Sequence, residues 1–456
     1  MIRMTKTNVS VPLPYIIFNG IRHAKDPIYL ISKTLNAYDT STYHLNIPRS
    51  KRMLTQDPAI INHVLQQNHK NYVKSKIVTE VLSKYAGKGL LTTNGDYWLK
   101  QRRLIQPGFH KHKIDELLAD MHVVIISVMD HISKKISSGQ ANFDLLDEMT
   151  TMTLKIVSKA LFSSDITEDQ IKVLKDGVQS LQEITLKEVQ NPLLSGWRKL
   201  SGYQQRSEAH LERIYKLVTS YILERRADSN PPSDLMTMLL DARYEGTDDG
   251  MTDQQILDEI LIIFVAGFET TTNALTFCLY LVSQHPAVLN RLQQEVKAIE
   301  LSDQPSVREV MGLHYITQVI SESMRLYPPA WFIDRVALED DEINGEKIAK
   351  GEIIALYTYG LHRSTDYWVD PDRFDPERFA LANKSNISPN TFLPFGKGPR
   401  LCIGSQFAQM EMNMVLYHFI RRFDFSLAQP YQLELDTKIT IRPKHGMPMH
   451  LNLRSN

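Results

Sequence analysis

Apolar positions with helical spacing dominate the middle of the chain. Between about residues 95 and 330 they recur every three to four positions, and the breaks are polar or rich in proline and glycine. Alternation within residues 41–58 predicts short strands instead, and strand-like pieces return after Pro328. The pattern predicts a mainly α fold with a minor β part.

The longest helical signal begins after Gly250. Thr252 is a good N-cap, and Gln255 follows three positions later, in the spacing of a capping box. The apolar pattern then continues until His285 and Pro286, which predicts a helix of roughly 33 residues, about 50 Å long. Because this helix is apolar on nearly every face, we expect it to run through the core.

The last part of the chain has a mixed pattern of strand-like, irregular and helical segments. We expect a strand over residues 352–357, an irregular stretch over 366–379 and an amphipathic helix over about 405–419. The alternation over residues 438–453 predicts a hairpin with its turn at His445-Gly446.

No internal repeat or linker composition marks a domain boundary, so we expect one domain over residues 1–456. Its β-rich part is expected mainly at 40–60 and 330–456, and its helical part mainly at 95–330.

Composition narrows the class of protein. Hydrophobic residues make up 43% and charged residues 23%, which is typical of a globular protein. Lys+Arg and Asp+Glu both number 52, so we expect no nucleic-acid partner. No apolar run is long enough for a membrane anchor, and no secretory cleavage pattern is present. Two cysteines fit a reducing compartment, and we interpret the protein as cytoplasmic.

One of these cysteines, Cys402, lies in the glycine-rich segment 395–404, just before the last predicted helix. The glycines let the backbone bend and approach a flat partner closely. A helix start favours a thiolate, which suits a soft metal ion. Arg400 can pair with an anionic group on the same cofactor. A lone cysteine in this position is otherwise most often an inert buried thiol.

The segment reads Phe-x-x-Gly-x-Arg-x-Cys-x-Gly and resembles the haem-binding signature of cytochromes P450 at every fixed position, from Phe395 through Arg400 and Cys402 to Gly404. The resemblance implies the P450 fold and haem b (iron protoporphyrin IX), with Cys402 as the axial ligand of the iron. It also implies a monooxygenase that takes O2 as co-substrate.

A second match lies within the long helix, at residues 266–271. A glycine there costs about 1 kcal/mol relative to alanine, and the plain reading is a harmless kink with a threonine bonded to its own helix. The resemblance implies instead an oxygen groove at Ala266, with Glu269 and Thr270 relaying protons.

Trp98 and Arg102 stand four residues apart, so that two pure hydrogen-bond donors point the same way. The resemblance implies that both, with Arg335 and Arg400, hold the haem carboxylates. Taken alone, Arg335 is equally compatible with a surface strand.

Glu322 and Arg325 share one helix face, a pairing that is common on solvated helices. By resemblance, Arg378 joins them in a buried structural triad behind the haem.

Substrate contacts are the least determined part of the site. By resemblance the walls would come from the long helix, the segment after the Pro-Pro pair and a C-terminal turn, although each residue fits an ordinary core equally well. These residues are Phe264, Val265, Phe268, Ala330, Trp331, Phe332, Ile333, Gly446, Met447 and Pro448. Their apolar character predicts a lipophilic small molecule. The stretches at 98–103 and 361–363 favour a fatty acid or similar lipid, ahead of a terpenoid, steroid or polyketide.

The chain ends 54 residues after Cys402, so we expect no fused reductase. Electrons from NAD(P)H would then arrive indirectly, through a ferredoxin or flavodoxin and its reductase, at a monomeric enzyme. A docking surface could include a cationic group that is otherwise read as a solvated face. Its members are Arg102, Arg103, Lys111, Lys113 and Lys397.

Three alternatives stay open. A P450 peroxygenase using H2O2 is disfavoured because such members replace Glu269 and Thr270 by arginine and proline. A P450-fold isomerase or dehydratase usually lacks the complete threonine motif. A non-catalytic haem-binding carrier or sensor would not need the oxygen groove.

Overall fold

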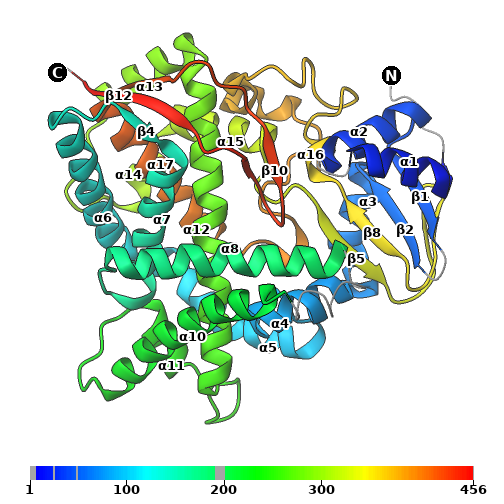
Figure 1. The fold of residues 1–456 in the computed structure, drawn as a ribbon, viewed down its shortest axis with the longest axis horizontal. Helices are drawn as coiled ribbons and strands as arrows, with labels where there is room; N and C mark the ends of the chain where they lie inside the picture. The colour runs from blue at the N-terminus through cyan, green and yellow to red at the C-terminus, as the bar shows by residue number, and fades with distance from the viewer. Residues whose placement is uncertain (1–6, 24–25, 48–49, 191–200, 455–456) are drawn as a thin grey trace.

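The computed structural model describes residues 7–23, 26–47, 50–190 and 201–454, and helices account for most of them. The largest sheet lies at one side of the molecule, beside α1 (Leu13–His23) and α2 (Pro27–Tyr38), whereas β4 (Asn142–Asp144) and β12 (Pro448–Leu453) lie at the other side (Figure 1). The predicted mainly α fold with a minor β part is confirmed.

Helix α12 (Asp253–Ser283) runs through the middle of the molecule (Figure 1). It has 31 residues and begins with the predicted capping box of Thr252 and Gln255. Among the described residues it is the one helix apolar and long enough to cross a membrane, and 72% of its most apolar window is buried inside the structure. That burial is typical of a core helix.

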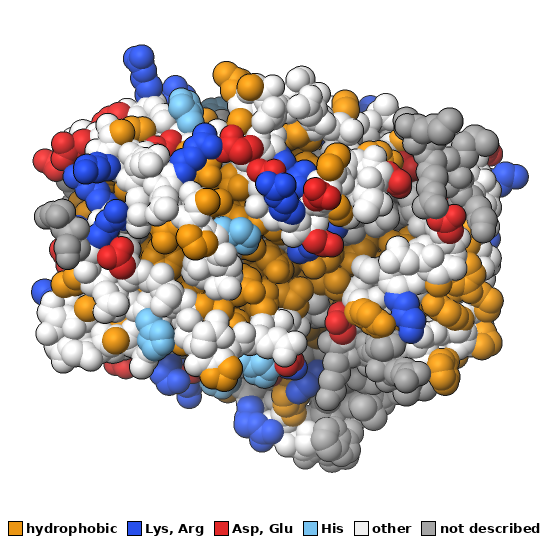
Figure 2. Space-filling model, turned by 90° about the horizontal axis from the view of Figure 1, so that it is seen from above, with side chains coloured by type: hydrophobic (Ala, Val, Ile, Leu, Met, Phe, Trp, Pro, Cys, Tyr) orange, Lys and Arg blue, Asp and Glu red, His pale blue; other side chains and the backbone are white. Residues whose placement is uncertain are grey.

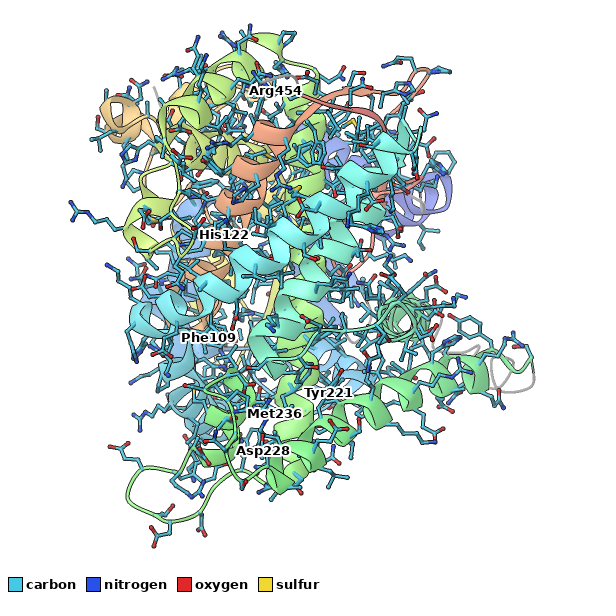
Figure 3. The ribbon with its side chains drawn as sticks, turned by 90° about the vertical axis from the view of Figure 1, so that its left-hand side faces the viewer. Phe109, His122, Tyr221, Asp228, Met236 and Arg454 are labelled. Carbon is cyan, nitrogen blue, oxygen red and sulfur yellow. The ribbon has the colours of Figure 1, made fainter. Side chains whose placement is uncertain are left out.

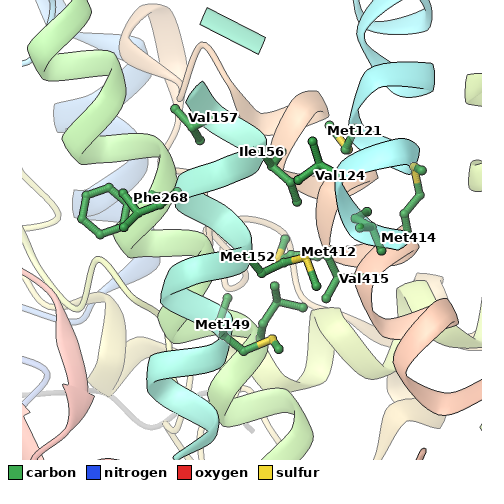
Figure 4. Close-up of a cluster of buried hydrophobic side chains, with 14 of the residues drawn as sticks. Met121, Val124, Met149, Met152, Ile156, Val157, Phe268, Met412, Met414 and Val415 are labelled. Atoms are coloured by element: carbon green, nitrogen blue, oxygen red, sulfur yellow. The ribbon is translucent and has the colours of Figure 1, made fainter. Parts of the chain in front are cut away.

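The helices that pack most extensively on α12 are α7 (Leu145–Phe162), α10 (Tyr203–Ala227), α15 (His314–Leu326) and α17 (Ser405–Arg422). From the side, α6 (Lys111–Ser137), which carries His122, lies across α17, and α10, which carries Tyr221, extends along the opposite edge (Figure 3). Methionines of α7 and α17 fill the space between these helices (Figure 4), because an unbranched, polarizable side chain adapts to irregular gaps.

The other helices are peripheral or short. They are α3 (Pro58–Asn62), α4 (Ser83–Ala86), α5 (Gly95–Ile105), α8 (Glu168–Gln190), α11 (Leu235–Asp241), α13 (Pro286–Ala298), α14 (Val307–Met311) and α16 (Thr358–Leu361).

The largest sheet joins distant parts of the chain in the order β1-β2-β8-β5-β3. β1 (Thr42–Ile47) and β2 (Ser50–Thr55) lie within 41–58, where short strands were expected, and they form an antiparallel pair. β8 (Ile353–Leu356) lies within the strand expected at 352–357. β8 runs parallel to β2 and antiparallel to β5 (Ile333–Ala337), which pairs with β3 (Tyr72–Val73). A separate hairpin joins β6 (Asp341–Ile343) to β7 (Glu346–Ile348).

The hairpin predicted over 438–453 is wrong. β11 (Ile441–Pro443) pairs with β10 (Leu435–Thr437), whereas β12 (Pro448–Leu453) pairs with β9 (Phe423–Leu427) and β4 (Asn142–Asp144). Alternation of apolar and polar residues indicates that one face of a strand is buried, but it does not show which strand lies beside it. The true hairpin turn therefore lies at residues 438–440.

A buried charge cluster ties α15 to the irregular stretch that follows the sheet. Arg325 donates to both carboxylate oxygens of Glu322, at 2.7 and 2.8 Å, and both side chains are fully buried. Arg378 donates to the same carboxylate at 3.3 Å. Arg325 also donates to the carbonyls of His362 and Pro371, each at 2.7 Å. The predicted triad is thus present, and its charges are well compensated.

We predict that Arg325→Met destabilises the protein by about 3–5 kcal/mol, because it leaves the Glu322 carboxylate buried and short of partners. Denaturant unfolding measures the change. Arg103→Met is the control, because Arg103 pairs with Glu245 at the surface and should contribute at most about 1 kcal/mol. Equal effects of the two substitutions would contradict the structural role of the triad.

Candidate functional site

The segment before α17 holds Cys402 through backbone geometry. The N–H of Cys402 donates to the Phe395 carbonyl at 3.0 Å, which closes the loop. Gly398 has a φ of 71°, and a Cβ there would collide with the Leu65 carbonyl. Glycine is therefore required at this position by both conformation and close approach.

The two cysteines occupy different environments. Cys278 is buried, whereas the Cys402 side chain is accessible. Protein atoms nevertheless surround Cys402 closely enough for burial to raise the pKa of its thiol, while the Gly404 N–H and the charge of Arg102 lower it. The thiol thus lines an internal space. Because a bound metal ion deprotonates a coordinating thiol, this sulfur fits a metal-binding cofactor.

The middle of α12 also contains an exposed position, Ala266, although most residues on either side are buried or half-buried. The Thr270 hydroxyl donates to the Ala266 carbonyl at 2.7 Å, the back-bonded geometry that the sequence left open. The Glu269 carboxylate accepts from Gln182 and from the Thr440 hydroxyl. Neither bond links Glu269 to Thr270, although the two residues are adjacent.

Buried cations converge beside the cysteine loop. The Arg400 guanidinium lies 4.1 Å from the centre of the Trp98 ring and donates to the Thr93 carbonyl and the Asn94 side chain. Burial and the charge of Arg335 lower the pKa of Arg400 to about 10. Arg335, on β5, is 8% exposed, and burial lowers its pKa to about 10 against the opposing charge of Asp334.

Lys74 belongs to the same group and was missed by sequence reasoning. Burial, Arg400 and Arg335 all hold the pKa of Lys74 well below its usual value. Its ammonium donates to the carbonyls of Leu90, at 2.6 Å, and Thr93, at 3.1 Å. A lysine after a short strand carries no distinguishing signal in one sequence.

Lys74 and Arg335 are buried and Arg400 is half-buried, and three such cations that repel one another are stabilised by an added anion. The cluster of Lys74, Arg335 and Arg400 therefore fits the carboxylates of the haem expected from the sequence.

Arg102 lies apart from this cluster. It donates to the Leu401 carbonyl at 3.0 Å and to the Gln106 side chain at 3.3 Å. Its charge acts on Cys402. A direct role of Arg102 toward a haem carboxylate stays a prediction.

The expected walls separate into two groups. Phe264, Phe268 and Met447 are buried in the main core, and Figure 4 shows Phe268 facing the side of Val157. Ala330 and Phe332 are exposed. Trp331 is buried and donates to the Lys438 carbonyl at 3.1 Å.

The C-terminal turn at 446–448 is held against the start of α7. Met447 bonds through its backbone to Asp144 and Leu145. The turn at 438–440, which carries Thr440, occupies the place expected for it. The error follows from the misassigned hairpin.

Comparisons with known proteins agree with this geometry. The cytochrome P450 family model matches residues 10–448. Putative cytochrome P450 132 of Mycobacterium tuberculosis is 30% identical over 86% of this chain and 85% of its own length. Cyclooctat-9-en-7-ol 5-monooxygenase of Streptomyces melanosporofaciens is 29% identical, over 80% and 78%. The crystal structure of the cytochrome P450DA heme domain superposes with a TM-score of 0.86 and 23% identity, covering 99% of this chain and 98% of that one.

The chain therefore belongs to the cytochrome P450 family. It is a P450 monooxygenase, and membership implies a bound haem and the use of O2.

Proposed function

We propose that this P450 inserts one oxygen atom from O2 into a lipophilic small molecule, on a haem whose iron is bound by Cys402. The observation that carries the proposal is the accessible thiol of Cys402 beside three cations, Lys74, Arg335 and Arg400, whose mutual repulsion Asp334 and Glu259 offset only in part. When bound, the haem would supply the activation of O2, and Cys402 would hold its iron as a thiolate.

Each part of the site has a separate task in this proposal. Trp98, Arg335 and Arg400, now joined by Lys74, hold the haem carboxylates through charge and N–H donation. The loop from Phe395 to Gly404 aims the sulfur and directs N–H groups toward it. Ala266 leaves room on α12 for O2, while Glu269 and Thr270 move protons. Arg102 steadies the cysteine loop through Leu401. The whole chain works as one P450 domain.

A fatty acid or similar lipid is the proposed substrate, ahead of a terpenoid, steroid or polyketide. A small apolar cluster joins the segment before α5 to α8, α10, α12 and the 438–440 turn. Its members include Leu82, Tyr85, Ala86, Leu181, Ile184, Leu211 and Ile262, with Ile439 against them. Figure 2 shows a hollow on one face where hydrophobic side chains gather. We propose that this cluster borders the substrate space, where apolar walls would favour an apolar ligand.

Electrons are proposed to come from NAD(P)H through a separate ferredoxin or flavodoxin and its reductase, to a monomeric enzyme in the cytoplasm. Arg103 and Lys111 are exposed, and Arg103 pairs with Glu245 only at the surface, so an acidic partner can reach both cations.

The test of the haem ligand is spectroscopic. We predict that the reduced, CO-bound protein shows the red-shifted Soret band of thiolate-ligated haem, and that Cys402→His abolishes it. Cys278→Ala, at the buried second cysteine, should keep the band. A wild-type protein that binds no haem would overturn the proposed function.

Thr270→Ala separates a catalyst from a carrier. We expect haem content and the CO band to persist while product per electron consumed falls at least about tenfold, because a proton-relaying group typically contributes 10²–10⁴-fold. Oxygen uptake, H2O2 release and product are measured together. A wild type that turns over with H2O2 as fast as with reduced partner and O2 would indicate a peroxygenase, and one that turns over with neither would indicate a carrier or sensor.

The substrate class is tested by optical titration. We predict that long-chain fatty acids shift the ferric haem spectrum by displacing water, and that charged, short-chain analogues do not. Terpenoids and steroids form the comparison panel. A shift with terpenoids alone would reverse the proposed order of substrates.

A further inference from the structure

We propose that Gln182 and Thr440 are positioning residues that hold Glu269 at the inner end of a polar pocket, and that this pocket is where the protons consumed by the reaction enter. The proposal rests on the proposed monooxygenase function, and it identifies groups outside α12 that serve it.

Two side chains from different elements hold the two oxygens of the Glu269 carboxylate. Gln182, on α8, donates through Nε2 to Oε2. Thr440, in the turn between β10 and β11, donates its hydroxyl to Oε1 at 2.7 Å. Asn273, one turn along α12, donates to the Thr440 oxygen at 3.3 Å. That bond occupies the Thr440 oxygen as an acceptor, which leaves the hydroxyl proton for Glu269.

The pocket behind this carboxylate has a volume of about 200 Å³, enough for several water molecules. It lies between α7, α8, α12 and β11, and most of its walls are polar. They are Asp144, Leu146, Asp147, Thr150, Lys175, Val178, Gln179, Gln182, Phe268, Glu269, Thr272, Asn273 and Arg442.

The pocket reaches the surface through charged side chains. Lys175 and Asp147 form an ion pair of 2.5 Å across it, and the Asp147 side chain is 65% exposed. Arg442 pairs with Asp436 at 3.0 Å. Water and protons can therefore enter between these residues, while the apolar Phe268 and Val178 bound the inner part.

Glu269 connects this pocket with the oxygen groove because it precedes Thr270 on α12. In the proposed cycle the carboxylate takes a proton from pocket water and passes one on to the Thr270 side. Because the carboxylate gives up one proton for each proton it takes, it is ionised again after the transfer, and a proton from bulk solvent neutralises the hydroxide left on the pocket water. Gln182 and Thr440 keep the Glu269 carboxylate turned toward the pocket, where it takes up the next proton.

The Gln182 side chain also argues against a purely structural tie between α8 and α12. Gln182 is 2% exposed, and its amide oxygen has no protein partner. A buried polar atom without a partner is costly, and an apolar side chain would pack the helices without that cost. The amide is explained if its N–H is needed at Glu269.

The test compares Gln182→Leu and Thr440→Val with the conservative Thr440→Ser, which keeps the hydroxyl. Thr276→Val is the matched control, because the Thr276 hydroxyl bonds only within α12, to the Thr272 carbonyl, and lies outside the pocket. Haem content, the CO band, thermal stability, product per electron and the solvent deuterium isotope effect on turnover are measured for each variant.

We expect Gln182→Leu and Thr440→Val to lower product per electron by about tenfold and to raise the solvent isotope effect, with haem content and the CO band unchanged. Thr440→Ser and Thr276→Val should behave as wild type. If Gln182→Leu does not fold, the Thr440→Val and Thr440→Ser pair decides.

A second variant tests the pocket while leaving the contacts of Glu269 in place. Thr150→Phe fills the pocket from α7, where the Thr150 hydroxyl bonds only to its own helix, at Leu146. We expect the same loss of coupling and the same rise in isotope effect. Unchanged values in all three variants, or a loss of stability with an unchanged isotope effect, would overturn the proposal. A wild type without haem or turnover would instead overturn the proposed function itself, and this inference with it.

Discussion

Burial of α12 determines where the other parts of the site can lie. The helix packs against α7, α10, α15 and α17. This packing fixes the position of the middle of α12 relative to the loop that precedes α17. The exposed Ala266 and the accessible Cys402 are departures from that packing, and both line internal space. A well-packed core leaves such space only where something else is to be bound. The fold is thus a rigid frame around a position reserved for a cofactor.

The charged side chains inside this frame follow two different principles. Glu322 and Arg325 satisfy one another and the surrounding carbonyls, so they stabilise the native arrangement without any ligand. Burial and the charge of Arg335 make it less favourable for Arg400 to stay charged, and burial does the same for Arg335 although Asp334 opposes it. The first group is therefore structural, while the second stores unfavourable energy that an anionic ligand would release. The same residue type has opposite roles because its partners differ.

Glu269 illustrates how a site extends beyond its motif. Its neighbour Thr270 is part of the same short sequence, yet the groups that hold its carboxylate come from α8 and from the 438–440 turn. Gln182 and Thr440 are separated from it by 87 and 171 positions. Contacts over such separations depend on helix packing and strand pairing, which local patterns do not encode.

The chain alone was sufficient to predict the mainly helical fold, the long capped helix and the short strands near the N-terminus, because these features depend on periodicity and capping, which are local. The Glu322 triad was predicted only through the family resemblance, since Arg378 lies far from Glu322 in the sequence. The partner of each late strand was decided only by tertiary structure, since β11 and β12 show the same alternation whichever neighbour they take. Tertiary structure also placed Lys74 near Arg335 and Arg400, and it buried Phe268 and Met447 in the core. The burial and the electrostatic surroundings of a residue depend on segments that are distant in the sequence. They are therefore determined only once the chain has folded.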